Sequence, residues 1–390
     1  MLLPLIIVAG APTRRLYELR VSSAMTGIAN VESAAAACHS GRFSGVFVTL
    51  ESNGRAASDA ERLAALSEDD RREFLQRECA CRHLLRTSPV PVFAAADTED
   101  LAGTAAGLFL AASHRICTQR TSIAFGDCPA GFSPGFGTLA VLSRLEPHIA
   151  AAVALGALRL NAHDCMALHL ATHFTPSRAS LDALRSELQA SPPEYYDVPL
   201  SRRTDPDPVR GCAGIQPCMH SFCARLSRCV CICGAVVPLC ATDRNTPLDA
   251  ALRDAFGPSA SGMTDVRRRL ERQRSIAAEH ALALANEPCG IHIGTRERAD
   301  TVRDVLTEAS NNLEHSCPEA LAATSAVLRL LHRQRRDMQY TDFDRLDQVL
   351  NAGLLAGQPE PASEGEAHGH AVADAVAAEL AALVGARAVQ

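Results

Sequence analysis

Residues Gly45 to Leu50 read GVFVTL, an uninterrupted run typical of a strand that is buried on both faces of a sheet. Pro89 to Ala96 is a second such run, and Asp59 to Arg86 between them carries apolar residues at helical spacing. Gly103 to Ser113 follows as a helix of small residues. Strands that alternate with helices need crossover connections, so the sequence predicts an α/β fold with a largely parallel sheet.

The residues before the first buried run are predicted to add two strands and a helix. Leu2 to Val8 and Leu16 to Val21 flank a turn at Gly10 to Thr13, which predicts a β-hairpin. Val31 to Cys38 is predicted to be helical. Because the first strand is expected to begin directly at Leu2, no cleavable presequence is expected.

The second half of the chain is predicted to be mainly helical, after an α/β core at residues 1–190. Residues 191–247 are rich in Cys, Arg and Pro without clear periodicity, which indicates an insertion. Residues 248–356 form a helical part, 357–370 (GQPEPASEGEAHGH) a polar linker, and 371–390 a final helical segment. The helices expected in the helical part are Leu248–Phe256, Thr264–Ala285, Thr301–Asn312, Pro318–Arg335 and Phe343–Leu355.

The composition excludes several classes of enzyme, because all 38 basic residues of this 390-residue chain are arginine. Schiff-base and pyridoxal-phosphate enzymes, Walker-type P-loop proteins and Ser-Lys hydrolases all need a lysine amine. A net charge of −6 with scattered arginines argues against an extensive nucleic-acid surface. No apolar run reaches the roughly 18 residues that cross a bilayer, so no membrane is expected. The 15 cysteines, an odd number without a secretory leader, indicate a reducing compartment.

Gly131 to Gly135 spells G-x-S-x-G, the pattern of a hydrolase nucleophile elbow around Ser133. An elbow uses the backbone N–H of the next residue as an oxyanion donor, but that residue is Pro134, which has no N–H. The preceding residues Asp127 to Ala130 also form a poor strand. We therefore expect a Gly/Pro loop here and not a nucleophile.

Two groups of metal-ligating residue types each allow two interpretations. His163, His169 and His173 could place a metal-binding pair one helical turn apart, but the acid of an H-E-x-x-H motif is missing, which favours ordinary histidines. A cysteine-rich stretch near His220 could bind zinc, but it has no C-x2-C spacing, which favours cysteines used as small apolar residues. Its cysteines are Cys212, Cys218, Cys223, Cys229, Cys231, Cys233 and Cys240. No metal is expected.

Two stretches carry a resemblance to a known family. Ala102 to Leu145 reads AGTAAGLFLAASHRICTQRTSIAFGDCPAGFSPGFGTLAVLSRL, and Ala154 to Phe174 reads ALGALRLNAHDCMALHLATHF. They resemble the crotonase (enoyl-CoA hydratase/isomerase) superfamily, and within it the 3-hydroxyisobutyryl-CoA hydrolase branch, whose motifs include Phe-Ala-Met-Pro-Glu, Gly-Leu-Phe-Pro-Asp-Val-Gly and Ala-Thr-His-Phe. A weaker similarity at Ser316 to Leu321 (SCPEAL) extends the resemblance over roughly residues 2–355. It implies a crotonase-like ββα superhelix with a helical C-terminal region.

In that superfamily two backbone N–H groups hold the thioester carbonyl of an acyl-CoA substrate. One comes from a loop after an early strand and the other from the start of the Gly-rich helix, where the helix dipole favours negative charge. The resemblance places these oxyanion donors at Ser58 and Thr104, where side chains replace glycines and crowd the approach of the thioester. It implies that the substrate lies against Ala56, Asp59, Gly103, Gly107 and Gly131.

The catalytic acids of the family are altered in this chain. The family's glutamate matches Asp127, a remnant carboxylate one methylene shorter, and its second acid matches Gly135, which has no side chain. A displacement of ~1 Å costs roughly 100-fold in rate, and a general acid or base contributes about 10²- to 10⁴-fold. Together the two changes remove about 5 to 8 kcal/mol of transition-state stabilisation.

These changes favour a non-catalytic protein that is retained for its surface. Relatives of the hydrolase are structural proteins of the mitochondrial ribosomal small subunit, so the resemblance implies a mitochondrial location, assembly proteins as partners and no cofactor. The acidic net charge would place a ribosomal position at the periphery, among protein neighbours. The alternative is an active 3-hydroxyisobutyryl-CoA hydrolase of valine catabolism, which binds acyl-CoA and uses Asp127 to activate water.

Overall fold

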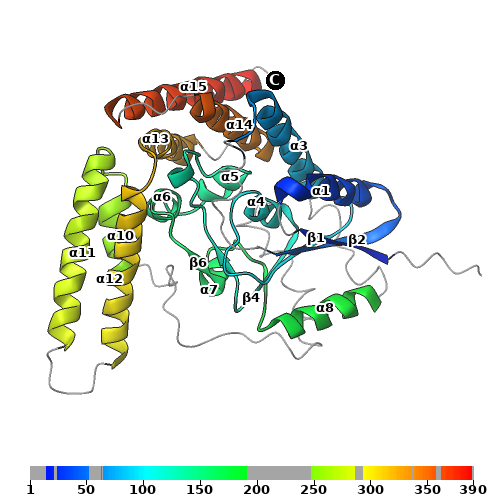
Figure 1. Cartoon of the computed structure of the whole chain (residues 1–390), viewed down its shortest axis with the longest axis horizontal. Coiled ribbons are helices and arrows are strands. Elements are labelled where there is room, and N and C mark those ends of the chain that lie inside the picture. Colours follow the sequence, from blue (N-terminus) through cyan, green and yellow to red (C-terminus); the bar gives the residue numbers. More distant parts are fainter. Residues whose placement is uncertain are drawn as a thin grey trace, which may run out of the picture.

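A five-stranded parallel sheet forms the framework of the chain (Figure 1). The computed structural model describes residues 15–21, 24–51, 63, 65–190, 247–285, 293–334, 338–356 and 362–388. In spatial order the strands are β1 (Arg15–Val21), β2 (Phe43–Leu50), β3 (Val92–Ala96), β4 (His114–Thr118) and β7 (His173–Thr175). Every neighbouring pair runs parallel, which confirms the sheet predicted from the alternation of strands and helices.

Both faces of this sheet are buried, as the uninterrupted apolar runs predict. Val46 and Val48 of β2 point into the main core, whereas Phe47 points to the other face and stacks on Phe93 of β3, with 6.2 Å between ring centroids. The helices α1 (Ala24–His39), α3 (Glu68–Arg86) and α4 (Gly103–Ala111) cover the first face, and α8 (Arg178–Ala190) covers the second (Figure 1). Leu181 of α8 packs in the smaller core with Phe47 and Phe93.

The strand predicted at Leu16 to Val21 is present as β1, and it pairs in parallel with β2. The other strand of the predicted hairpin, Leu2 to Val8, lies outside the described residues. The helix predicted at Val31 to Cys38 is present as the longer helix α1.

The prediction of one continuous helix from Asp59 to Arg86 is wrong at its start. A turn occupies Ala65 and Leu66, and α3 begins only at Glu68. Ser67 caps the helix, because its hydroxyl accepts the backbone N–H of Asp70 at 3.2 Å. The apolar periodicity continued through the turn and concealed this cap.

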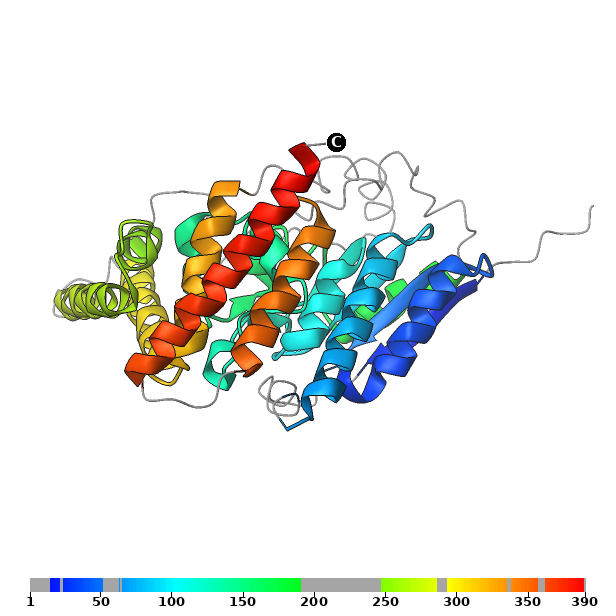
Figure 2. The same cartoon turned by 90° about the horizontal axis from the view of Figure 1, so that it is seen from above.

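Six helices are described in the C-terminal region, and the last three of them form a layer beside α1 and α3 (Figure 2). They are α10 (Pro247–Phe256), α11 (Met263–Ala285), α12 (Ile293–Glu314), α13 (Pro318–Gln334), α14 (Tyr340–Ala356) and α15 (Ala362–Ala388). This confirms the predicted helical region, although α12 starts before the expected Thr301. Helices α11 and α12 pair with each other at the end of the molecule away from β1 (Figure 1).

The linker predicted at residues 357–370 is wrong over its second half, because α15 begins at Ala362. One of its glycines, Gly369, serves close helix packing. A Cβ on Gly369 would collide with the carbonyl oxygen of Glu319 in α13, so glycine lets the two helices approach. None of the described helices is both long and apolar enough to cross a bilayer.

Short elements connect the sheet to this helical layer. They are β5 (Ser122–Ile123), the 3₁₀ turn η1 (Cys128–Ala130), α5 (Thr138–Leu142), α6 (Pro147–Leu155), β6 (Leu160–Asn161) and α7 (Ala162–Ala167). Strands β5 and β6 form a separate antiparallel pair. The loop between η1 and α5 carries the positions expected to form part of the site.

Candidate active site

The start of α4 lies where the predicted oxyanion donor was expected. It follows the carboxyl end of β3, the edge at which parallel sheets bind ligands, and it opens with Gly103 at φ 53°. The first N–H groups of a helix have no partner within the helix and are therefore available to an oxyanion. Thr104 is fully buried, and its hydroxyl has no hydrogen-bond partner among the described residues. The hydroxyl is a separate group from the backbone N–H, whose role as oxyanion donor stays a prediction.

Gly107, predicted to lie against the substrate, has a packing contact instead. A Cβ on this residue would collide with the backbone carbonyl oxygen of Phe136. The glycine therefore lets α4 lie directly on the loop of residues 131–137. The helix with the predicted donor and the loop with the missing acid are in contact.

Asp127 lies at the tight turn that enters η1, shortly after β5. Its backbone carbonyl accepts the N–H of Ala130 at 3.0 Å and that of Phe132 at 3.2 Å. The residue is only 6% exposed, so its carboxyl group is held in a largely buried position. Gly131 ends this turn in the left-handed region at φ 83°, and a Cβ there would meet nothing within 4 Å. Its backbone conformation accounts for the glycine at 131.

Ser133 does not lie on a nucleophile elbow, as the sequence predicted. No strand enters it, and the next described helix, α5, begins only at Thr138. Ser133 is 1% exposed, its hydroxyl accepts the hydroxyl of Thr324 at 2.9 Å, and its backbone N–H donates to Asn351 Oδ1 at 3.0 Å. Both of its polar groups are therefore used to hold the loop.

Gly135, where the resemblance predicts that the family's second acid is absent, faces side chains of α14. A Cβ on Gly135 would lie 2.8 Å from Asn351 Nδ2 and 3.2 Å from Asp347 Oδ1. The φ of Gly135 is not in the left-handed region, so the backbone does not require glycine. The space that a side chain would enter is occupied by Asn351 and Asp347.

Asp347 belongs to a buried cluster of ions between α3 and α14, which the sequence did not reveal. Arg82 lies at its centre and donates from Nε to Glu78 Oε1 and from Nη1 to Asp344 Oδ1, both at 2.6 Å. Its Nη2 lies 3.7 Å from Asp347 Oδ2. Arg86 Nη1 lies 3.2 Å from Asp344 Oδ1. Three carboxyl groups thus share two guanidinium groups out of contact with water.

Burial changes the protonation of this cluster. It raises the pKa of Glu78 to about 7 and that of Asp347 to about 6, although Arg82 acts in the opposite direction on both. A cavity of about 10 Å³ adjoins these two carboxyl groups and Ser133, which is room for about one water molecule. The cluster therefore takes up a proton more readily than exposed carboxylates do.

The sequence contained a weak signal for this cluster. Asp344, Asp347 and Asn351 are spaced by three and four residues, and so are on one face of α14. Glu78 and Arg82 are likewise four residues apart on α3. Such spacing is common on exposed helix faces, and the partnership between the two helices could not be inferred from it.

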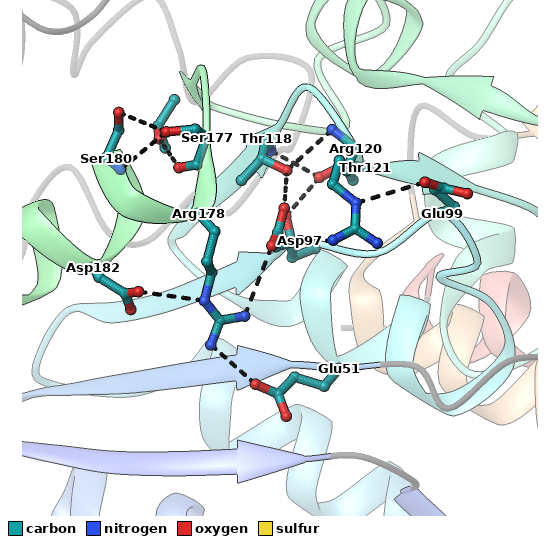
Figure 3. Close-up of polar contacts among 12 residues, drawn as sticks. Glu51, Asp97, Glu99, Thr118, Arg120, Thr121, Ser177, Arg178, Ser180 and Asp182 are labelled. Atoms are coloured by element: carbon teal, nitrogen blue, oxygen red, sulfur yellow. Dashed lines mark hydrogen bonds and ion pairs between the residues drawn. The ribbon is translucent and has the colours of Figure 1, made fainter.

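A second polar cluster lies at the carboxyl edge of the sheet (Figure 3). Asp97, directly after β3, accepts the hydroxyl of Thr118 at 2.6 Å. The guanidinium group of Arg178, at the start of α8, contacts three carboxylates. Its Nη2 lies 3.1 Å from Glu51 Oε1, its Nη1 3.8 Å from Asp97 Oδ2, and its Nε 3.6 Å from Asp182 Oδ2. Its hydrogen bond to Glu51 raises the pKa of Arg178, so the guanidinium stays charged. Arg178 ties α8 to the ends of β2 and β3.

The histidines do not form the metal pair that was considered. His169 lies in the turn after α7, at φ 57°, whereas His173 lies in β7, so the pair predicted one helical turn apart does not share a helix. Burial lowers the pKa of His173 to about 4, which keeps it neutral. No group of three His, Cys, Asp or Glu residues suited to a metal occurs within the described ranges.

Several predicted positions lie outside the described residues. These are Ala56, Ser58 and Asp59 of the predicted oxyanion loop, and the whole cysteine-rich stretch around His220. Five of the seven described cysteines are buried, whereas Cys79 and Cys317 are partly exposed. Burial raises the pKa of Cys117 and Cys128 to about 12, so both thiols are protonated at neutral pH.

Comparison with known proteins agrees with this arrangement. A family model described as Enoyl-CoA hydratase/isomerase matches residues 46–205. Probable 3-hydroxyisobutyryl-CoA hydrolase 2 of Arabidopsis thaliana is 40% identical over 86 residues, which are 22% of each chain. Probable 3-hydroxyisobutyryl-CoA hydrolase 3 of the same plant is 36% identical over 105 residues, 26% of this chain and 28% of the relative. The matches thus span 22% and 28% of the curated relatives' length.

Solved structures share the architecture over most of the chain. A carnitinyl-CoA dehydratase from Mycobacterium thermoresistibile matches with a TM-score of 0.59 and 15% identity, covering 88% of this chain and 82% of its own. An enoyl-CoA hydratase from Rhodobacter sphaeroides matches with a TM-score of 0.55 and 18% identity, covering 88% and 83%. At these identities the likeness shows a common fold.

The parallel sheet, the Gly-rich helix start at its carboxyl edge and the helical C-terminal region together define a protein of the crotonase fold. The sequence matches add the family to which the chain is similar. Residues 46–205 match the enoyl-CoA hydratase/isomerase (crotonase) family, and shorter segments are similar to 3-hydroxyisobutyryl-CoA hydrolases.

Proposed function

We propose that this chain is a 3-hydroxyisobutyryl-CoA hydrolase-like protein that no longer hydrolyses thioesters and that serves as a structural component of an assembly. The observation that carries the proposal is the filled space at Gly135, where Asn351 Nδ2 would lie 2.8 Å from a Cβ. A glycine in an open pocket would leave room for water or substrate to replace the acid. At Gly135, the side chains of Asn351 and Asp347 occupy the space that a side chain on this residue would enter.

The chemistry of hydrolysis explains why this matters. Attack of water on a thioester carbonyl requires a base that removes a proton from water and donors that stabilise the oxyanion. The start of α4 supports an oxyanion donor, and Asp127 supplies one buried carboxyl group. The resemblance to the hydrolases implies that the second acid would lie at residue 135, which is a glycine without a side chain.

A thiol-release assay tests the loss of activity. Purified protein is given 3-hydroxyisobutyryl-CoA, and free CoA thiol is followed over time. We expect no release above the background of buffer and of an Asp127→Asn variant. The exposed Asp69, whose side chain is 94% exposed, supplies a matched control in Asp69→Asn. Hydrolysis that Asp69→Asn retains and Asp127→Asn loses would refute the proposal.

A second candidate function is an active acyl-CoA hydrolase that uses Asp127 alone. The observation that favours it is the carboxyl group of Asp127, which is largely buried at the turn into η1, just before the 131–137 loop. In this case coenzyme A thioesters are the substrates, and the same thiol-release assay distinguishes the two candidates.

For the structural role, we propose protein partners within a mitochondrial assembly, and the small subunit of the mitochondrial ribosome is the specific candidate. The resemblance to ribosomal relatives of the hydrolase motivates it, and the net charge of −6 favours protein neighbours over extensive RNA contact. Sedimentation of mitochondrial extract should place the chain with small subunits. A profile confined to slowly sedimenting fractions rules out this assembly.

A further inference from the structure

We propose that Asn351 and Asp347 of α14 have taken the place of a side chain on residue 135, with Asn351 as the residue that positions the loop of residues 131–137. The inference concerns the packing of this loop, and it holds whether or not the chain hydrolyses a thioester.

The first step of the argument is steric. A Cβ on Gly135 would lie 2.8 Å from Asn351 Nδ2, closer than real Cβ contacts come, and 3.2 Å from Asp347 Oδ1. Gly135 has no positive φ, so an alanine would suffer no backbone strain at this position. Occupied space is therefore what excludes a side chain here.

The second step is that Asn351 cannot easily move aside. It is 5% exposed, and both ends of its amide group are used. Its Oδ1 accepts the backbone N–H of Ser133 at 3.0 Å, and its Nδ2 donates to Asp347 Oδ1 at 2.9 Å. Asp347 Oδ2 in turn accepts the backbone N–H of Gly137 at 3.1 Å. The pair thus binds the loop on both sides of Gly135.

The third step is electrostatic. An aspartate at residue 135 would bring a second carboxyl group against Asp347. The nearby guanidinium of Arg82 is already shared with Glu78 and Asp344, and Arg86 is bonded to Asp344. Two carboxyl groups in contact without a further cation can persist only by sharing a proton.

From these steps it follows that the acid cannot be restored by a substitution at residue 135 alone. The change from acid to glycine and the presence of Asn351 are coupled in space. A variant that removes the Asn351 amide should accept a side chain at residue 135 that the parent protein rejects.

A double-mutant cycle on the full chain tests this coupling. Gly135→Ala, Asn351→Ala and the double variant are compared by thermal unfolding, with Gly262→Ala as control because Gly262 has no positive φ and nothing within 4 Å of its Cβ position. Gly135→Ala should lower Tm by roughly 1 to 4 °C more than the control does. The double variant should lose less than the sum of the two single losses, since the added methyl group enters the vacated space.

Two results overturn the inference. One is a Gly135→Ala variant that is no less stable than Gly262→Ala. The other is strict additivity of the Gly135 and Asn351 changes. If Asn351→Ala alone prevents folding, Asn351→Ser in the same cycle retains a small polar side chain and provides the second comparison.

The pH dependence of stability in an Asn351→Asp variant tests the contact with Asp347 separately, because a purely steric role of residue 351 would not change this pH dependence. The new carboxyl group would face Asp347 on α14, with Asp344 nearby, and the α3 groups Glu78, Arg82 and Arg86 opposite. A shared proton binds the folded state more tightly than the unfolded state, so stability should fall more steeply with rising pH than in the parent. A pH profile parallel to that of the parent protein contradicts the assigned contact between residues 351 and 347.

Discussion

The buried carboxyl group of Glu78 should make the stability of this protein fall as the pH rises. Glu78 lies in α3, its side chain is 1% exposed, and Arg82 donates to it at 2.6 Å. Burial raises its pKa from 4.5 to about 7, since the attraction of Arg82 is smaller than the cost of burial and Asp347 and Asp344 add repulsion. Between pH 4.5 and about 7, Glu78 is therefore protonated in the folded chain and ionised in the unfolded chain.

The sign and size of the effect follow from this difference in pKa. Below pH 4.5 both states are protonated and the full stability is present. Between pH 4.5 and about 7 the folded state binds more protons, so the free energy of unfolding falls as the pH rises. A difference of about two and a half pKa units corresponds to a loss on the order of 3 kcal/mol by pH 8.

The perturbation is Glu78→Gln, which keeps an oxygen to accept the hydrogen bond from Arg82 but cannot ionise. Its free energy of unfolding should decline less between pH 5 and pH 8 than that of the parent, by on the order of 2 to 3 kcal/mol. Some decline remains, because burial also raises the pKa of Asp347 to about 6.

The measurement is urea unfolding followed by circular dichroism at pH 5, 6, 7 and 8. Glu68→Gln on the same helix is the matched control, since the Glu68 side chain is 77% exposed and pairs only with Arg72 within the described residues. Its pH profile should follow that of the parent. Parallel profiles for the parent and Glu78→Gln would show that Glu78 is ionised at pH 5 in the folded state, which refutes the reasoning.

Three further substitutions test other contacts. Arg82→Met leaves the surrounding carboxyl groups without a compensating charge and should lower the free energy of unfolding in urea by about 3 to 5 kcal/mol. In the control Arg72→Met, the arginine is 58% exposed and pairs with Glu68, so the loss should be less than about 1 kcal/mol. Equal losses would contradict the buried cluster. Thr104→Val removes a buried hydroxyl without a partner among the described residues and should leave stability unchanged or raise it by about 1 kcal/mol, so a clear loss would reveal a partner. Ser133→Ala removes one hydrogen bond and should lower the free energy of unfolding by about 1 kcal/mol. If this variant also lost any thioester hydrolysis, the result would support Ser133 as a nucleophile.

Strands β1, β2 and β3 could be predicted from the sequence because their signal is local, whereas the short strands β4 and β7 were not predicted. Gly45 to Leu50 and Pro89 to Ala96 are apolar on both faces, and the structure buries both faces of β2 and β3. The start of α3 could not be predicted from apolar periodicity, because the periodicity runs through the turn before Ser67. The start of α15 before residue 371 could not be predicted, because its glycine is equally typical of a flexible linker. The structure shows that Gly369 instead allows α15 to pack closely on α13.

The positions of the site could be predicted only where motifs carry them. The motif around Asp127 and Gly135 located the turn and the loop correctly in the chain. The side chains that complete the loop come from α14, more than two hundred positions away from the residues they touch, as the contact of Ser133 with Asn351 shows. No local pattern specifies such a contact, because it depends on how the helical layer docks on the sheet domain.

A glycine at a catalytic position has two physical meanings, and the structure separates them. In an open site the lost side chain leaves a space that water or a substrate group can enter, so some activity can persist. At Gly135 the space is closed by an amide and a carboxyl group that are themselves tied to the loop backbone and to Arg82. The loop has become part of the buried interface between α3 and α14. An acid at residue 135 would therefore require changes in α14 as well, so a single substitution at this position is not enough to introduce one.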